Sequence, residues 1–187
     1  MNTPLKTQRI EWLAKTAEGY TGAGFNPEGR MAARGSHRRP LAIAARCGQC
    51  IGSTDPNAGE RIADCPMVVC PLYPHRSHQH GKYRDNLAAL KATLPPAPPG
   101  VVLSPMERAR LNPESRAMAV RAYCYDCMGG QPVGRTNTNG NVRKMVGDCS
   151  VTRCALWDVR PWQNAGDEEE NGESEENADG QECEDEI

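Results

Sequence analysis

The chain has few of the large apolar side chains that normally fill a protein core. Among its 187 residues there are one Phe, three Trp and five Tyr, and only 38% of the residues are hydrophobic. Glycine and proline are instead abundant, with 18 and 15 copies. Because a fold with little apolar core generally depends on disulfides or metal ions, we expect the cysteines to hold this protein together.

Long hydrophobic segments are missing as well. No stretch approaches the roughly 18 apolar residues that a membrane helix requires. Residues 1–11 also lack the apolar segment of a secretory signal. We therefore predict a cytoplasmic protein without membrane contact. Thiols stay reduced in the cytosol, so closely spaced cysteines there indicate metal binding rather than disulfides.

Basic residues are absent from the C-terminal end. All 22 Lys and Arg residues precede Asp167, whereas twelve of the 24 acidic residues lie in residues 167–187. The body of the chain therefore carries a net charge of about +10 and the tail about −12. A basic body predicts a polyanionic partner, most often nucleic acid. A run of like charges predicts a disordered tail.

Eight of the nine cysteines form four close pairs, and these pairs belong to an internal repeat. Residues 39–52 match residues 116–129 without a gap and share the pattern Arg-x-apolar-Ala-apolar-x-Ala-x-Cys-x-x-Cys-x-Gly. Residues 64–76 match residues 148–160 and share Asp-Cys-x4-Cys, a Leu-aromatic pair and an Arg. We expect each unit to consist of a helix, a Cys-x2-Cys knuckle, a loop and the Cys-x4-Cys segment.

The four cysteines of each unit fit a tetrahedral site of thiolates. We predict two structural zinc ions, one per repeat, bound by Cys47, Cys50, Cys65, Cys70 and by Cys124, Cys127, Cys149, Cys154. An iron–sulfur cluster is the alternative, because four thiolates suit both groups. Ligands exchanged between the repeats are a second alternative. The duplication favours one site per repeat, since an ancestral single copy had to fold alone.

These features predict a small metal-stabilised α+β fold with two tandem zinc modules of the ribbon or knuckle type, short helices and a disordered acidic tail. The expected order is an N-terminal helix (1–18), a basic linker (19–38), zinc module 1 with a following helix (39–94), a Pro-rich linker (95–103), zinc module 2 (104–166) and the tail (167–187). Ser104 and Glu107, with Pro105 after the serine, form a capping box that should begin a helix.

Candidate nucleic-acid contacts are basic or aromatic residues near the cysteine pairs. Basic side chains bind phosphates, and aromatic rings can stack on bases. The candidates are Arg34, Arg38, Arg39, Arg46, Arg76, Lys82, Arg84, Arg116, Arg121, Tyr123, Arg143 and Lys144.

Three histidines, His75, His78 and His80, follow the first Cys-x4-Cys segment. Together with Asp85 they could form the site of a metal-dependent nuclease. The second repeat has no histidine at the matching positions, so we favour a solvated basic segment. We expect no enzymatic activity, because a metal bound by four cysteines has no open coordination position.

The spacing Cys124-x2-Cys127-x21-Cys149-x4-Cys154 is similar to that of the zinc finger of the Ogr/Delta family of phage late-transcription activators. The resemblance implies a zinc module that contacts DNA and host RNA polymerase, and a phage protein that acts in the host cytoplasm. It covers about 31 residues of the second repeat; the first repeat has 14 residues where the second has 21. Residues 121–130 and 154–157 also resemble short cysteine-rich proteins of phages and prophages.

Three functions compete. The first is a zinc protein that binds nucleic acid and regulates transcription, as the basic body and the arginines indicate. The second is a protein-interaction module that modulates a host polymerase or defence complex, with the acidic tail mimicking nucleic acid. The third is the metal-dependent nuclease.

Overall fold

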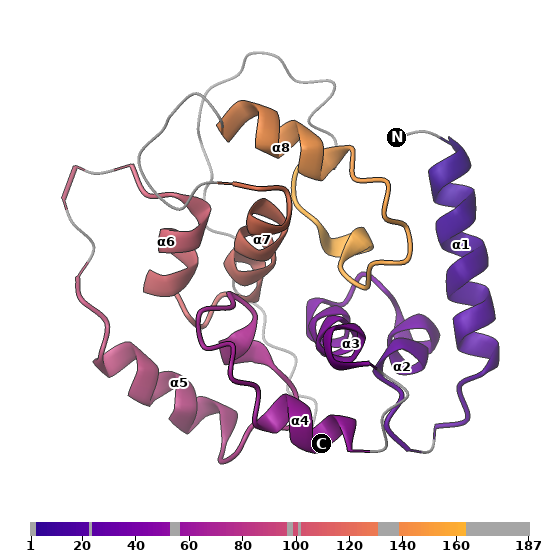
Figure 1. Cartoon of the computed structure of the whole chain (residues 1–187), viewed down its shortest axis with the longest axis horizontal. Helices are drawn as coiled ribbons and strands as arrows, with labels where there is room; N and C mark the ends of the chain where they lie inside the picture. The colour runs from indigo at the N-terminus through magenta and orange to yellow at the C-terminus, as the bar shows by residue number, and fades with distance from the viewer. Residues whose placement is uncertain are drawn as a thin grey trace.

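In the computed structural model, residues 3–22, 24–52, 57–96, 99–100, 102–130 and 139–163 are described. Their regular elements are all helices (Figure 1). The α-helices are α1 (Thr3–Glu18), α2 (Pro27–Arg34), α3 (Arg39–Ile51), α4 (Ala58–Ala63), α5 (Tyr83–Ala92), α6 (Pro105–Leu111), α7 (Arg116–Cys127) and α8 (Asn139–Gly147). Two short 3-10 helices, η1 (Tyr73–His75) and η2 (Trp157–Val159), follow the two Cys-x4-Cys segments.

The predicted α+β class is wrong: no strand occurs in the residues that the structure describes. The ribbon or knuckle modules are wrong as an architecture too, since each Cys-x2-Cys pair lies in the last turn of a helix, Cys47 and Cys50 in α3, Cys124 and Cys127 in α7. Positions three apart lie on one helix face, and the alanine-rich sequence before each pair favours a helix that continues through it. Within the described ranges, no three Cys, His, Asp or Glu side chains are arranged to hold a metal ion.

The internal repeat is visible in the backbone hydrogen bonds around the Cys-x4-Cys segments. The amide of Cys65 donates to the carbonyl of Ile62, and that of Cys149 to Val146, both at 3.3 Å. Two further bonds also recur at an offset of 84 residues, from Cys70 to Met67 and from Cys154 to Val151, both at 3.0 Å. The two segments therefore have the same turn.

The repeat also begins earlier in the chain than the matched sequence indicates. Helices α2 and α6 occupy equivalent places before α3 and α7, and each starts with a capping side chain followed by proline: Asn26-Pro27 and Ser104-Pro105. The predicted capping box of Ser104 and Glu107 is confirmed, with both of its hydrogen bonds present. Residues 19–38, for which we expected a basic linker, thus contain a helix that packs on α3.

The two repeats share one hydrophobic core. Its buried members include pairs at equivalent positions, such as Ala42 with Ala119 and Leu72 with Leu156. Figure 1 shows α3 and α7 in the middle of the molecule, with the other helices around them. The expected Pro-rich linker at residues 95–103 therefore joins two halves that pack against each other, and a second core cluster lies among α6, α7 and α8.

Helix α1 lies outside the repeat and is fixed by a buried arginine. The Arg9 side chain, with 1% of its surface exposed, donates to Asp158 Oδ2 (Nε, 2.8 Å; Nη2, 2.5 Å) and to the carbonyls of Thr152 (2.8 Å) and Cys154 (3.0 Å). Its guanidinium also lies 4.7 Å from the ring centroid of Trp12. Helix α1 thus covers the Cys-x4-Cys turn of the second repeat.

Two expectations concern parts of the chain outside the description. The acidic tail at residues 167–187 and the single Cys183 both lie beyond the described residues. Among the described helices, none combines the length and the apolar character needed to cross a membrane.

Candidate metal centres

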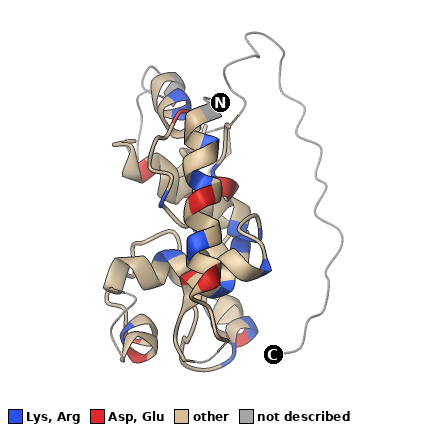
Figure 2. Cartoon of the chain, turned by 90° about the vertical axis from the view of Figure 1, so that its right-hand side faces the viewer, with Lys and Arg blue, Asp and Glu red and all other residues tan. Residues whose placement is uncertain are grey.

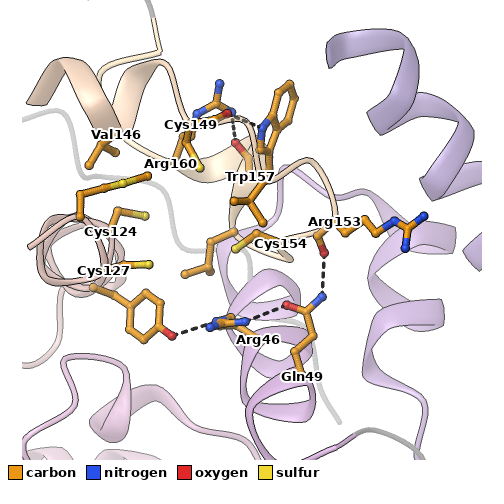
Figure 3. Close-up of a pocket in the computed structure, with 14 residues that line it drawn as sticks. Arg46, Gln49, Cys124, Cys127, Val146, Cys149, Arg153, Cys154, Trp157 and Arg160 are labelled. Carbon is orange, nitrogen blue, oxygen red and sulfur yellow. Dashed lines mark hydrogen bonds between the residues drawn. The ribbon is translucent and has the colours of Figure 1, made fainter. Parts of the chain in front are cut away.

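The four cysteines of each repeat line one pocket. Site 1 contains Cys47, Cys50, Cys65 and Cys70, and site 2 contains Cys124, Cys127, Cys149 and Cys154. Figure 3 shows the four side chains of site 2 around a common space between α7 and the segment after α8. The structure therefore groups the predicted ligands by repeat and does not mix ligands from the two repeats.

Local structure brings each set of cysteines together. The first pair projects from the last turn of a long helix, whose core face anchors it. The second pair frames a tight turn held by the backbone bonds described above and by the 3-10 helix that follows. Four soft thiol donors from two segments around one space are a set that suits zinc or an iron–sulfur cluster.

Burial and mutual proximity make these thiols weak acids. Burial, followed by the neighbouring cysteines, raises the pKa of Cys47 and of Cys124 to about 12. Burial also raises the pKa of Cys70 and of Cys154. These thiols are therefore protonated at neutral pH unless a cation displaces their protons, so metal binding at either site would release protons and weaken as the pH falls.

A pattern of contacts that recurs in both repeats supports each site from below. The Arg76 side chain stacks on Tyr73 at 3.8 Å and donates to the carbonyls of Tyr73 (2.9 Å) and Ala63 (3.2 Å). Arg160 does the same in the second repeat, with Trp157 as the ring and Gly147 as the distant carbonyl. The arginine that ends each matched sequence thus ties the Cys-x4-Cys turn to the helix before it.

The equivalence continues three residues further than the sequence match. Gln79 donates to the carbonyls of Pro74 (3.3 Å) and Arg76 (3.2 Å), and Gln163 donates to the carbonyls 84 residues later, both at 2.9 Å. His78 and Trp162, also 84 residues apart, share the same left-handed backbone with φ of 58°. Each repeat therefore ends in the same compact turn.

The two sites lie on either side of one cross-repeat contact. Arg46 donates to the hydroxyl of Tyr123 at 2.9 Å, and both residues line both pockets. These positions are equivalent in the two repeats, 77 residues apart. Contact between equivalent positions is typical of an isologous interface close to its two-fold axis. The repeats are thus arranged as a pseudo-dimer within one chain.

Residues of one repeat also complete the wall of the other repeat's pocket. Gln49 of the first repeat donates to the carbonyl of Arg153 (2.8 Å) and accepts from the amide of Ala155 (3.1 Å), on both sides of Cys154 (Figure 3). Asp126, the equivalent of Gln49, lines site 1. Sequence reasoning missed Gln49 and Arg9, because their partners lie more than 100 residues away and no local pattern marks them.

The candidate nucleic-acid residues fall into two groups. Exposed ones are Arg34, Arg38, Arg39, Lys82, Arg84, Arg116, Arg143 and Lys144. The half-buried ones are Arg46, Arg76, Arg121 and Tyr123. The last group has partners inside the molecule, such as the Trp162 ring 5.5 Å from the Arg121 guanidinium. Only the exposed group offers its charges directly to a polyanion.

The three histidines do not converge. His75 is buried and its Nδ1 lies 2.8 Å from the Tyr83 hydroxyl, whereas His78 packs against Phe25 and His80 Nε2 lies 2.7 Å from Asp64 Oδ1. Their separate partners remove the arrangement that a shared metal or nuclease site would need. The segment is also less solvated than we expected, because His75 is buried.

Burial, with the nearby Arg116 charge, lowers the pKa of His75 to about 4. In the unfolded chain the pKa is about 6.5. The unfolded state therefore binds more protons between these values, and stability falls as the pH drops below 6.5. We expect the free energy of unfolding to decrease by about 1.4 kcal/mol more in the wild type than in His75→Gln between pH 7.5 and 5.5. Urea titrations at both pH values measure this, and equal decreases in the two proteins would contradict it.

Comparisons with models of known families, with curated proteins and with solved structures find no match to this chain. The resemblance to the Ogr/Delta family therefore rests on the cysteine spacing of the second repeat alone. The geometry of the two sites has to carry the functional argument.

Proposed function

We propose that this protein binds two metal ions, one per repeat, and uses the resulting rigid body to bind nucleic acid as a phage-type regulator of transcription. The observation that supports the proposal is that the four cysteines of each repeat surround one pocket. A metal at each site would link two distant segments of a chain that has little apolar core.

Zinc is the metal we propose, with Cys47, Cys50, Cys65 and Cys70 as ligands at site 1 and their equivalents at site 2. When bound by four thiolates it would be structural, without chemistry of its own. Elemental analysis of reduced protein separates zinc from iron. Reduced thiols require a reducing compartment, so a cytoplasmic location belongs to the same proposal.

The nucleic-acid part of the proposal is supported by the exposed basic residues and by the charge of about +10 before Asp167. Figure 2 shows basic positions on several helices rather than in a single cluster. An extended distribution of this kind favours contacts to phosphates along a duplex or strand over recognition of a few bases.

Arg38 and Arg39 precede α3 and are exposed, so their removal should weaken binding without disturbing the fold. We expect the double variant R38A/R39A to bind a labelled DNA or RNA duplex several-fold more weakly at 100 mM salt. The slope of log K against log salt should become shallower by about one for each phosphate that the variant no longer neutralises. Fluorescence anisotropy across a salt series measures both quantities.

Lys6→Ala is the matched control, since Lys6 is an exposed cation of α1 outside the candidate set, and it should bind like the wild type. Salt-independent binding, or none by the wild type at low salt, would refute the nucleic-acid part of the proposal. The metal part would remain standing.

A second candidate function is favoured by an exposed apolar turn in the first repeat. Met67, Val68 and Val69 are 55%, 66% and 62% exposed. Exposed apolar side chains in a row are typical of contact with another protein. A host polymerase or another protein complex that co-purifies in stoichiometric amounts after nuclease treatment would favour this function over nucleic-acid binding.

Catalysis is not part of the proposal. His75, His78 and His80 have different partners, and sites of four cysteines leave no open position for a substrate. Metal-dependent cleavage of plasmid DNA that is lost in His78→Ala would overturn this point.

A further inference from the structure

The duplication provides a comparison of two related sites inside one molecule. Sites 1 and 2 have the same donors on the same helix turn and the same Cys-x4-Cys backbone. Any difference in how firmly their ligands are held must therefore come from the surroundings. Those surroundings differ in four respects, and all four favour site 2.

The first difference is helix α1, which covers the turn of site 2 only. Arg9 donates to the carbonyls of Thr152 and Cys154, and so fixes the backbone of one ligand directly. The equivalent carbonyls of site 1 belong to Val68 and Cys70. In the described part of the chain no side chain donates to either of them.

The second difference is the bond across the pseudo-two-fold axis. Gln49 holds the backbone on both sides of Cys154 through a donated and an accepted hydrogen bond. Asp126 cannot reproduce this at site 1, because a carboxylate has no proton to donate. The residue equivalent to Ala155 is Pro71, which has no amide proton to offer either.

The third difference lies in the aromatic residue after the turn. The indole Nε1 of Trp157 donates to the carbonyl of Cys149 at 3.1 Å, and the ring is 4% exposed. Tyr73 occupies this position at site 1, and it has no ring N–H and is only half-buried. Site 2 therefore has a hydrogen bond to its third ligand that site 1 lacks.

The fourth difference is the enclosure of the two sites. The space at site 2 measures about 260 Å³, and that at site 1 about 550 Å³. Met67 and Val69, both more than half exposed, form part of the wall of site 1. Solvent and competing ligands thus have a wider approach to the thiols of site 1.

From these contrasts we infer that the two sites have different roles: site 2 is the permanent structural site, and site 1 is an exchangeable site that releases its metal first. Metal transfer proceeds by stepwise replacement of ligands, so the site whose turn can move and admit a competitor loses its ion sooner. The inference rests on the proposed binding of one metal ion per repeat. It makes site 1, next to the exposed Met67–Val69 turn, the part of the protein that responds to metal availability.

The test uses the wild-type full chain loaded with zinc and challenged with an excess of chelator. Samples are taken over time, free thiols are alkylated, and the modified cysteines are located by peptide mass spectrometry. We expect Cys47, Cys50, Cys65 and Cys70 to become labelled at least tenfold faster than the four cysteines of site 2. Equal rates, or faster labelling of site 2, would overturn the inference and leave metal binding intact.

A variant outside the ligand set checks the cause. Gln49→Ala should speed labelling of the site 2 cysteines about tenfold, the effect of losing a hydrogen bond or two. It should leave the rates at site 1 unchanged, and Asp126→Ala, the matched substitution, should change neither site. Unchanged site 2 labelling in Gln49→Ala would show that the cross-repeat bond does not hold the site. A purified reduced protein without stoichiometric metal would refute both this inference and the proposed function.

Discussion

Removal of metal from the reduced full-length chain should abolish most of its helical circular dichroism at 25 °C. Structural zinc sites supply about 10–16 kcal/mol of apparent binding energy at pH 7, whereas a domain of this size is stable by only about 5–15 kcal/mol. The core that remains is made largely of alanines and a few larger aliphatic side chains. It cannot replace the links that the metals provide.

The measurement is far-UV circular dichroism before and after dialysis against chelator under reducing conditions, followed by addition of one, two and three equivalents of zinc. The helical signal should return in full at two equivalents. Cys154→Ser should show the loss without chelator, because its site is held by Arg9 and Gln49 around that residue. Cys183→Ser is the matched control and should behave like the wild type. A metal-free chain that keeps its helical signal and unfolds cooperatively on heating would contradict the prediction.

The repeat and its cysteines could be predicted from the sequence because they depend on local patterns. Cys-x2-Cys and Cys-x4-Cys recur with the same neighbours, and the backbone repeats with them. The fold class could not be predicted in the same way. A Cys-x2-Cys pair fits both a β-knuckle and one turn of a helix, and we chose the knuckle although the alanines before Cys47 and Cys124 favour a helix. A capping residue followed by proline at residues 26–27 and 104–105 was the available sign that α2 and α6 belong to the repeat.

Contacts between distant segments carried no sequence signal. Arg46 and Tyr123 look like ordinary candidates for binding nucleic acid, and only their equivalence under the 77-residue offset hints that they meet. The same is true of Gln49, whose partners lie more than 100 residues later. Charge alone did not separate arginines that face solvent from arginines that hold the core, such as Arg9 and Arg160.

Arg9→Ala should destabilise the protein by about 3–5 kcal/mol, the usual cost of removing one member of a buried ion pair. Arg9 is among the largest fully buried side chains of the described chain, and Asp158, which accepts two of its hydrogen bonds, is itself only 20% exposed. The substitution leaves that carboxylate and the carbonyls of Thr152 and Cys154 without their donor. It also leaves a cavity between α1 and the site 2 turn.

Urea unfolding of the zinc-loaded protein measures the change, and Lys6→Ala, an exposed cation on the same helix, should alter the free energy of unfolding by less than about 0.5 kcal/mol. Arg9→Lys should recover only part of the stability, because a single ammonium group cannot match the fork of a guanidinium that contacts one carboxylate and two carbonyls. If Arg9→Ala were as stable as Lys6→Ala, α1 would not hold the site 2 turn. The contrast between the two sites would then depend on Gln49 and Trp157, whose partners are the backbone groups on both sides of Cys154 and the carbonyl of Cys149.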